Sequence, residues 1–325
     1  MAFVTGIYLI DAPASALNMG EGEETTATVK AIRVGAYEYP YVSAQAFRYW
    51  LRRTLETTNG EWVSAPIYTA GKGQRQQAYT EGDPIAYWDD DLFGYMRAVK
   101  EATRTRLSPF RTSTLVSIAP VEITRDFGVM ARHEGDPVLH GHEFYSTVLK
   151  GLFSLNLSAV GTFSYIDRSG HLNLDSALQE EAQRQGLEHL ADRRCYRLPY
   201  EERVRRVQAL LQALGRLQGG ARQTLHYTDV APAFVMAAVT AGGNHIFSRV
   251  VTAQHGRPVL HERALDEALN SLRGDILSSV HVGIAQGFMD DAAETLRRYG
   301  LEVRHPREAL DALAGEVAQN WAWWE

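Results

Sequence analysis

The run Phe3-Val4-Thr5-Gly6-Ile7-Tyr8-Leu9-Ile10 decides the fold class predicted for this chain. It is short and combines β-branched with aromatic residues, which is the composition of a buried strand. A secretion signal also begins with an apolar run, but this one lacks a basic start and is interrupted at Gly6 and Asp11. We therefore expect the chain to open with a strand inside a hydrophobic core.

Helical periodicity follows in several segments. Residues 43–57 begin at Ser43, a residue type that caps helices, and repeat apolar side chains every three to four positions before Asn59-Gly60. Residues 201–217 have the same spacing and stop before Gly219-Gly220. Three shorter helices are predicted, at 262–273, 289–299 and 306–319.

Strand composition fills much of the remaining chain. Two stretches, 121–130 and 138–145, flank the turn sequence 133–137, which predicts a long hairpin. Gly242-Gly243-Asn244 predicts a second hairpin, between 233–240 and 245–252. With a further strand near 278–285 the order of elements is α+β. An RRM-like (ferredoxin-like) sheet with helices on one face accommodates that order.

The composition is that of a globular protein. With 325 residues, 45% apolar and 22% charged, the chain can bury a large core, as one domain with insertions or as two small domains. The single cysteine, Cys195, excludes a disulfide framework within the chain. No apolar stretch reaches the roughly 18 residues that a membrane span needs. We expect a cytoplasmic protein without a membrane partner.

The charge is unevenly distributed. A net charge of −6 argues against binding of nucleic acid, because neutralisation of phosphates by Lys and Arg dominates that binding. Residues 97–111, however, hold five bases against one acid, and residues 290–325 hold eight acids against four arginines. Segregated faces of this kind suit both RNA binding and head-to-tail self-association. Ordinary solvated charge on opposite faces explains the pattern equally well.

Three groups of residues have the features of anion sites. Each combines free backbone N–H groups, at a helix start or a glycine turn, with a nearby cation. They are Ser43, Gln45 and Arg48; Gly219, Gly220 and Arg222; and the loop 71–77 with Lys72 and Arg75. Each group alone also matches an ordinary helix cap or glycine turn. Together the three groups favour a long polyanion over a small ligand.

Catalytic and metal-binding patterns are weak. His140 and His142 fall on one face of a strand, where zinc could be held with His133 or Glu143, but histidines on exposed hairpins are more often solvated. Asp126-Phe127-Gly128 matches the magnesium triplet of kinases without the other kinase motifs. We therefore expect no catalytic residues, no metal and no cofactor.

Several segments, taken in order, resemble the DevR-type backbone subunit of type I (I-B-like) CRISPR Cascade complexes, a branch of the RAMP superfamily. The segments are Asn18-Met19-Gly20, residues 41–52, Asp91-Leu92-Phe93-Gly94, Ser108-Pro109-Phe110-Arg111, His142-Glu143-Phe144-Tyr145, residues 219–229 and Gly242-Gly243-Asn244-His245. No single segment is specific to the family; their order and spacing carry the resemblance, which covers most of the chain.

The resemblance implies one RRM-like domain over residues 1–325, with a finger insertion at about 60–110 and a thumb hairpin at about 118–146. It also implies the partners: a CRISPR guide RNA, a target DNA strand paired with that guide, further copies of the chain in a helical filament, and other Cascade subunits. Protein that holds a nucleic-acid backbone while base pairing reads the sequence needs phosphate contacts and stacking wedges.

The expected binding residues follow from the sequence features and the resemblance together. For RNA they are Asn18, Gly20, Ser43, Gln45, Arg48, Arg52, Lys72, Arg75, Arg111, Gly219, Gly220 and Arg222. Phe127 and Met130 are expected either to wedge between bases or to cover the core. The rival function is a metal-dependent endoribonuclease of the RAMP type, for which Asp89, Asp90 and Asp91 offer carboxylates.

Overall fold

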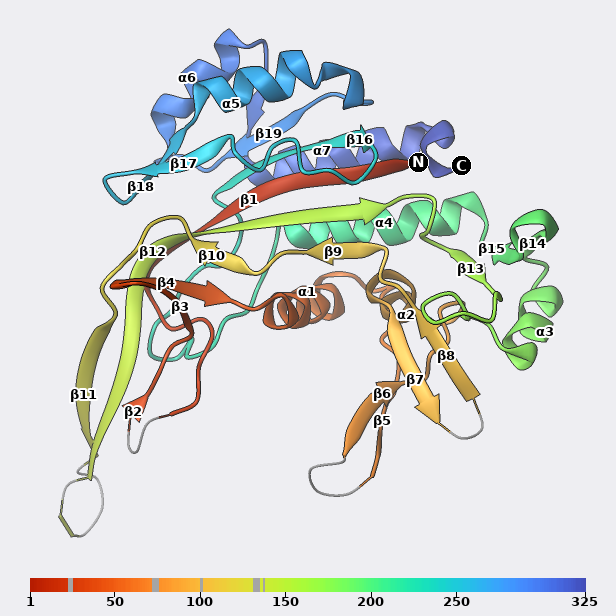
Figure 1. The fold of residues 1–325 in the computed structure, drawn as a ribbon, viewed down its shortest axis with the longest axis horizontal. Helices are drawn as coiled ribbons and strands as arrows, with labels where there is room; N and C mark the ends of the chain where they lie inside the picture. The colour runs from red at the N-terminus through yellow and green to blue at the C-terminus, as the bar shows by residue number, and fades with distance from the viewer. Residues whose placement is uncertain (23–25, 72–75, 100–101, 131–134, 137) are drawn as a thin grey trace.

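A computed structural model describes residues 1–22, 26–71, 76–99, 102–130, 135–136 and 138–325. Its largest feature is a sheet whose strands run in the order β20-β19-β16-β1-β12-β10-β4-β3 (Figure 1). β1 (Ala2–Ser15) lies between β12 (Val138–Asn156) and β16 (Phe234–Ala241) and is antiparallel to both. The predicted opening strand is therefore confirmed as a central strand.

The alternating side chains of β1 supply two separate cores. Val4 and Tyr8 pack into the core on one face of the sheet, and Ile7 and Leu9 pack into the core on the other. All four side chains are fully buried, because neighbouring strands cover both edges of β1 and other elements cover both of its faces.

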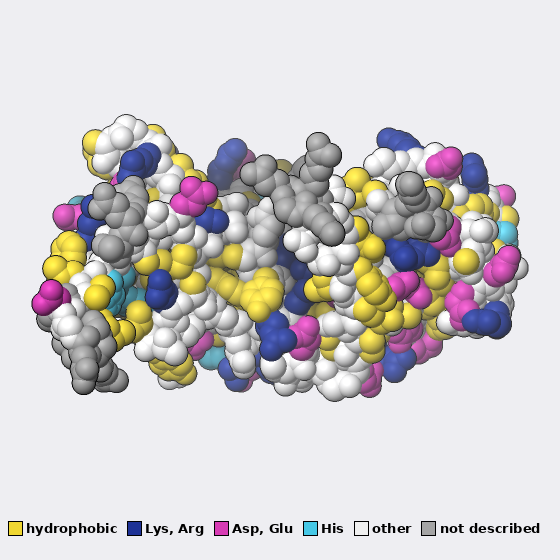
Figure 2. Space-filling view, turned by 90° about the horizontal axis from the view of Figure 1, so that it is seen from below, with side chains coloured by type: hydrophobic (Ala, Val, Ile, Leu, Met, Phe, Trp, Pro, Cys, Tyr) yellow, Lys and Arg dark blue, Asp and Glu magenta, His cyan; other side chains and the backbone are white. Residues whose placement is uncertain are grey.

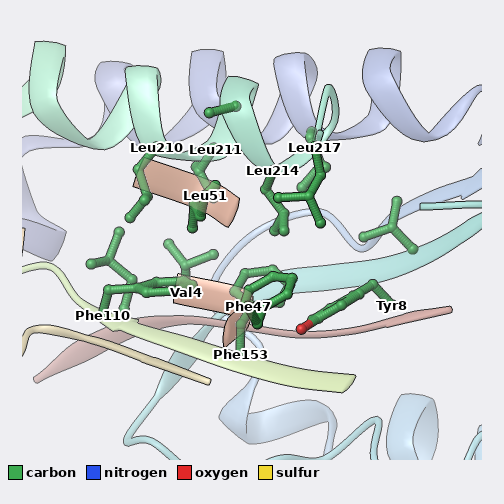
Figure 3. Close-up of a cluster of buried hydrophobic side chains, with 14 of the residues drawn as sticks. Val4, Tyr8, Phe47, Leu51, Phe110, Phe153, Leu210, Leu211, Leu214 and Leu217 are labelled. Carbon is green, nitrogen blue, oxygen red and sulfur yellow. The ribbon is translucent and has the colours of Figure 1, made fainter. Parts of the chain in front are cut away.

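Three helices cover the first face. They are α1 (Ala44–Thr58), α4 (Tyr200–Leu214) and α7 (Pro306–Gln319). Figure 3 shows leucines of α4 pointing toward Leu51 and Phe47 of α1, with aromatic rings from the sheet beneath them. The Phe47 ring stacks on Tyr8 of β1, with 5.1 Å between ring centroids. Both long helices predicted from apolar spacing are confirmed.

The second face is covered by the C-terminal part of the chain before α7. In chain order the covering elements are β17 (Val251–Gln254), β18 (Arg257–Leu260), α5 (Glu262–Asp266), a π-helical turn (Glu267–Ser271), a short 3₁₀ helix (Arg273–Asp275) and α6 (Asp290–Arg298). From the same part of the chain, β19 (His281–Ile284) and β20 (Val303–Arg304) extend the sheet itself. These elements pack on the core that holds Ile7 and Leu9.

One predicted hairpin is wrong. β16 pairs with β1 and β19 instead of with residues 245–252, while β17 pairs with β18. β16 is apolar on both faces and therefore gains more by lying in the middle of the sheet than in a two-stranded ribbon. The turn at residues 242–244 instead carries the chain to Phe247, which is buried in the second core.

Two sets of hairpins extend to the same side of the molecule, with α1 between their bases (Figure 1). The first, here called the long hairpin, is β11 (Thr124–Met130) with the first half of β12; β2 (Thr26–Ala27) runs beside it. The second set, here called the paired hairpins, is β5 (Ile67–Ala70) with β6 (Gln77–Thr80) and β7 (Tyr95–Val99) with β8 (Ala102–Arg106).

The remaining elements complete the edges of the molecule. β3 (Ala31–Val34), β4 (Tyr37–Val42), β9 (Phe110–Thr112) and β10 (Leu115–Ser117) extend the main sheet. A small unit contains β13 (Thr162–Ser164), α3 (Ser176–Arg184), β14 (Glu188–Leu190), a 3₁₀ turn (Ala191–Arg193) and β15 (Cys195–Arg197). A final 3₁₀ turn spans Trp321–Trp324. No helix in the described part of the chain has the length and hydropathy to cross a bilayer.

A buried ion network ties the base of the paired hairpins to α4. Asp91, in α2 (Trp88–Phe93), is fully buried and pairs with both Arg106 of β8 and Arg206 of α4. The expectation of a basic surface over residues 97–111 is therefore wrong for Arg104 and Arg106, whose side chains are 7% and 4% exposed. Their charges hold the fold together and are closed to a ligand.

Candidate nucleic-acid interface

α1 lies between the bases of the long hairpin and the paired hairpins (Figure 1). Ser43 has extended backbone geometry, and its hydroxyl accepts a hydrogen bond from the Ala46 N–H at 3.3 Å. The first turn of the helix holds no acidic residue, so its remaining N–H groups and partial positive charge are not neutralised locally. Gln45 and Tyr49 are exposed on this helix.

Two arginines of α1 pack against one aromatic ring. The guanidinium carbons of Arg48 and Arg52 lie 5.4 and 4.3 Å from the centroid of Phe93. Arg48 also donates to the Phe93 carbonyl and, at 3.1 Å, to the Ser108 hydroxyl. Burial, reinforced by Arg52, lowers the pKa of Arg48 to about 10, so it stays charged at neutral pH. These cations are held rigidly, with some of their donors already committed.

A glycine turn lies directly beside α1. Gly219 and Gly220 have φ angles of +153° and +98°, which a residue with a side chain rarely adopts. The Thr54 hydroxyl of α1 donates to the Gln218 carbonyl at 3.3 Å and accepts from the Gln218 N–H at 2.9 Å. Arg222 follows the turn, exposed and in the left-handed region at φ 54°. The structure thus places the predicted glycine turn against the helix whose first turn is another predicted anion site, with the contact at Thr54 in its C-terminal half.

The segment containing Asn18 and Gly20 adjoins the same turn. The Ala221 N–H donates to the Leu17 carbonyl at 3.0 Å. Asn18 is itself buried, and its side-chain amide donates to the Tyr41 carbonyl at 3.4 Å. The Gly20 N–H donates to the Thr28 carbonyl at 2.8 Å. In this structure Asn18 supports the shape of the loop and does not present its amide to solvent.

The other predicted cations lie elsewhere. Arg111 is exposed on β9, which pairs with the far half of β12. Lys72 and Arg75 fall outside the described residues. Figure 2, which looks onto the side where the hairpins project, shows basic and hydrophobic side chains interspersed between the two ends of the molecule. Charge alone therefore does not mark a continuous track across this face.

The long hairpin carries its apolar side chains in solvent. Phe127 is 69% exposed and Met130 is 52% exposed, which excludes the alternative that they cover the core. Across the ladder, Met130 is paired with Val138 and Val129 with Leu139, and these partners are exposed as well. An exposed apolar ribbon of this kind is normally a binding element.

Sequence reasoning missed a contact between the long hairpin and the glycine turn. The His226 ring lies 5.5 Å from His142 and 5.0 Å from Phe144, both on β12. Burial, followed by the charges of His142 and Arg222, lowers the pKa of His226. The next residue, Tyr227, is 93% exposed. The available signal was an aromatic pair, His226-Tyr227, shortly after the double glycine at 219–220.

Among the described residues, the hairpin histidines do not form a metal centre with other ligands, and the predicted ligand His133 lies outside those residues. His140 and His142 share a face of β12 as expected, with 6.5 Å between ring centroids. Within residues 1–22, 26–71, 76–99, 102–130, 135–136 and 138–325, no three His, Cys, Asp or Glu side chains are grouped closely enough to hold a metal ion.

The carboxylates of the rival nuclease site are occupied by protein groups. Asp89 accepts from the Ala65 N–H at 2.8 Å, and Asp90 accepts from Gly82 and Asp83 N–H groups at 2.9 and 3.0 Å. Asp91 is enclosed by two arginines. Burial raises the pKa of Asp90 to about 6. All three side chains point into the protein and anchor α2.

The family model described as "CRISPR-associated negative auto-regulator DevR/Csa2" matches residues 8–248. The chain belongs to the DevR/Csa2 family. The matched region contains α1, the long hairpin and the glycine turn, and it ends before α5, α6 and α7. The candidate interface thus lies within the part of the chain that defines a DevR/Csa2 protein.

Solved structures agree with this DevR/Csa2 assignment at the level of fold. One chain titled "CRISPR RNA-guided surveillance complex" superposes with a TM-score of 0.57 at 15% identity, covering 97% of this chain and 99% of that one. Another, titled "CRISPR RNA-guided surveillance complex, pre-nicking", gives a TM-score of 0.59 at 14% identity, covering 96% and 99%. No curated protein matches the chain in sequence.

Proposed function

We propose that this chain is a non-catalytic backbone subunit of a CRISPR surveillance complex, which polymerises along the guide RNA and presents it to target DNA. The DevR/Csa2 match and the titles of the two superposed structures support this role. The observation that carries it is the attachment of the Gly219–Gly220 turn to α1, through paired hydrogen bonds between Thr54 and Gln218, and to the segment that precedes the helix, through Leu17 and Asn18.

A ferredoxin-like palm is part of the proposal. The strands β16-β1-β12-β10 are adjacent and antiparallel, with α1 following β1 and α4 following β12. This is the βαββαβ order of a ferredoxin-like or RRM-like unit with both helices on one face. On this view the long hairpin is the thumb and the paired hairpins belong to the finger, all within one domain.

The proposed phosphate track runs over the N-terminus of α1 and the glycine turn. Backbone N–H groups and the positive end of α1 suit an anion, and glycines allow a sugar-phosphate chain to approach the backbone closely. Arg222, exposed beside the turn, adds charge. Arg48 and Arg52, fixed on Phe93, contribute positive potential more than new hydrogen bonds.

The long hairpin is proposed as a wedge. Phe127 and Met130 are exposed on a ribbon that projects from the palm. Inserted between nucleotides, an aromatic side chain gains roughly 1–3 kcal/mol per stacked base. Protein contacts of this kind carry no sequence code, so recognition of the target is left to base pairing with the guide.

We assign cleavage of nucleic acid to other components of the complex. The rival reading, a metal-dependent endoribonuclease, needs a carboxylate that can hold a metal ion or a water molecule. Asp89, Asp90 and Asp91 are buried and bonded to backbone amides or arginines. As a backbone subunit, the chain is proposed to bind guide RNA, target DNA through the guide, further copies of itself and other Cascade subunits. We propose that this assembly forms in the cytoplasm.

RNA binding by the purified chain tests the phosphate track. Affinity for single-stranded RNA, measured by fluorescence anisotropy, should fall steeply between about 50 and 200 mM salt and show little dependence on sequence. Arg222→Ala should weaken binding and reduce the slope against log salt by about one unit. Arg257→Ala, at an exposed arginine of β18 on the opposite face, is the matched control and should change neither. Salt-independent binding would refute the proposal.

A further inference from the structure

The hairpin formed by β5 and β6 carries an aromatic layer that the fold does not require. Tyr68 and Tyr79 are cross-strand partners, and their rings stack with 5.9 Å between centroids at 28°. The Arg97 guanidinium lies 5.9 Å from the centroid of Tyr79. The layer thus runs from Arg97 through Tyr79 to Tyr68, which is 43% exposed at its outer end.

Nothing in the described part of the chain covers the apolar side chains of β5. All four residues of β5 are exposed, including Ile67 at 73%. Exposed tyrosine and isoleucine side chains add little hydrophobic stabilisation to a strand unless a partner covers them. Cross-strand stacking of the two tyrosines stabilises the hairpin itself, but it leaves the outer part of Tyr68 uncovered.

The charge around the layer favours an anionic ligand. Residues 62–80 contain Lys72 and Arg75 and no acidic residue, in a chain whose net charge is −6. The nearest carboxylate is Glu81, which hydrogen-bonds to the Tyr68 hydroxyl and thereby raises the pKa of Tyr68. Glu81 is itself paired with Arg97 at 2.8 Å and lies 4.0 Å from Arg104. Its charge is therefore neutralised within the protein.

An exposed aromatic ring in a segment whose sequence holds basic and no acidic residues suits single-stranded nucleic acid. Any of the bases can stack on such a ring, and a segment without acidic residues does not repel the phosphates. A folded protein partner would need a larger apolar surface with polar groups placed to match it. We propose that Tyr68, supported by Tyr79 and Arg97, is a stacking platform for one base of a single-stranded nucleic acid. This proposal rests on the proposed function, because it adds a second contact point to the same nucleic-acid-binding side.

The platform predicts a specific ranking of variants at one position. Tyr68→Phe keeps the ring and should bind an oligouridine RNA like the wild type. Tyr68→Leu keeps an apolar side chain without a π face and should weaken binding about tenfold, as should Tyr68→Ala. The slope of affinity against salt should stay unchanged, because the phosphate contacts are intact. Tyr37→Ala, at a tyrosine that is 61% exposed on the β3–β4 hairpin, is the control and should bind normally.

The assay separates the possible failures. If the wild type does not bind RNA, the proposed function fails. If the wild type binds and Tyr68→Leu and Tyr68→Ala bind equally well, the function stands and the platform is overturned. A changed salt slope, or equal losses in Tyr37→Ala, would also overturn it, since the effect would then not arise from stacking at this site. Melting temperatures of all variants should match that of the wild type.

A second arm identifies the strand that is bound. Guide-loaded protein is titrated with a complementary DNA strand. Weaker guide loading by Tyr68→Leu assigns the stacked base to the guide RNA. Normal loading with weaker capture of the DNA assigns it to the target strand. Both outcomes support a platform for single-stranded nucleic acid, whereas unchanged behaviour in both steps overturns it.

Discussion

The indole ring of Trp50 occupies the space that a side chain at Gly219 would need. A Cβ atom placed on Gly219 would lie 2.4 Å from Trp50 Cγ, far inside van der Waals contact. Trp50 belongs to α1 and Gly219 to the glycine turn, so this contact fixes the relative position of the two segments proposed to hold the RNA backbone.

Replacing Gly219 should therefore lower RNA affinity as well as the stability of the fold, because the turn must move. Gly219→Ala must shift the turn away from Trp50, and we expect a loss of about 1–3 kcal/mol in the free energy of unfolding together with a marked loss of RNA affinity. Gly60→Ala is the matched control, because a Cβ at Gly60 meets nothing within 4 Å. Chemical denaturation and anisotropy measure the two effects. Normal RNA affinity in Gly219→Ala would show that the turn does not contact RNA.

The buried network at Asp91 should be essential for folding. Asp91→Ala leaves Arg106 and Arg206 buried without their shared carboxylate, and removal of one partner from such a network costs about 3–5 kcal/mol. Urea denaturation should show that loss. Asp126→Ala, at an aspartate whose side chain is 64% exposed, should change stability by no more than about 0.5 kcal/mol. An Asp91→Ala protein whose urea midpoint of unfolding equals that of the wild type would contradict the role assigned to this network.

Asp90 should make stability depend on pH in a particular direction. Its pKa is raised from 3.8 to about 6, chiefly by burial, so the folded state binds a proton more tightly than the unfolded state does. Protonation therefore favours the fold. As the pH falls from 7 to 4, the wild type should gain up to about 3 kcal/mol relative to Asp90→Asn, and the gain should level off below pH 4. Parallel pH profiles of unfolding for the two proteins would contradict this account.

Much of the fold could be predicted from the sequence where local patterns and burial agree. The opening strand, α1, α4 and the long hairpin all have clear periodicity or turn residues, and the structure confirms each. The hairpin predicted around residues 242–244 failed because local turn signals cannot reveal that β16 pairs with β1, more than two hundred residues earlier in the chain. Non-local pairing decides such cases.

The site was only partly predictable for a related reason. Helix capping at Ser43 and the glycine turn could be predicted locally, but the packing of that turn on α1 depends on Trp50 and Thr54. The density of basic residues in the sequence was a poorer guide to the binding surface. The sequence predicts Arg104 and Arg106 as surface cations, yet both are buried against carboxylates of other elements, Asp175 and Asp91. A sequence gives the number of charges in a segment but not the partners that neutralise them.

The long hairpin should be separable from the folded core. Shortening residues 127–140 to a tight turn removes Phe127 and Met130, which are exposed, and should leave the melting temperature close to that of the wild type. Ordered assembly on the guide should be lost, and regularly spaced unpaired positions in the guide–target duplex should vanish. An unfolded variant would show that the hairpin is part of the core, and a variant that assembles normally would show that it is no wedge.

Polymerisation along RNA is the central claim, and the mass of the assembly measures it directly. Light scattering of the purified chain with guide RNAs of increasing length should give particles whose mass rises in steps of one subunit, because each copy covers a fixed length of RNA and contacts the next copy head to tail. A particle of constant mass on every RNA, such as a closed dimer that ignores RNA length, would contradict the account.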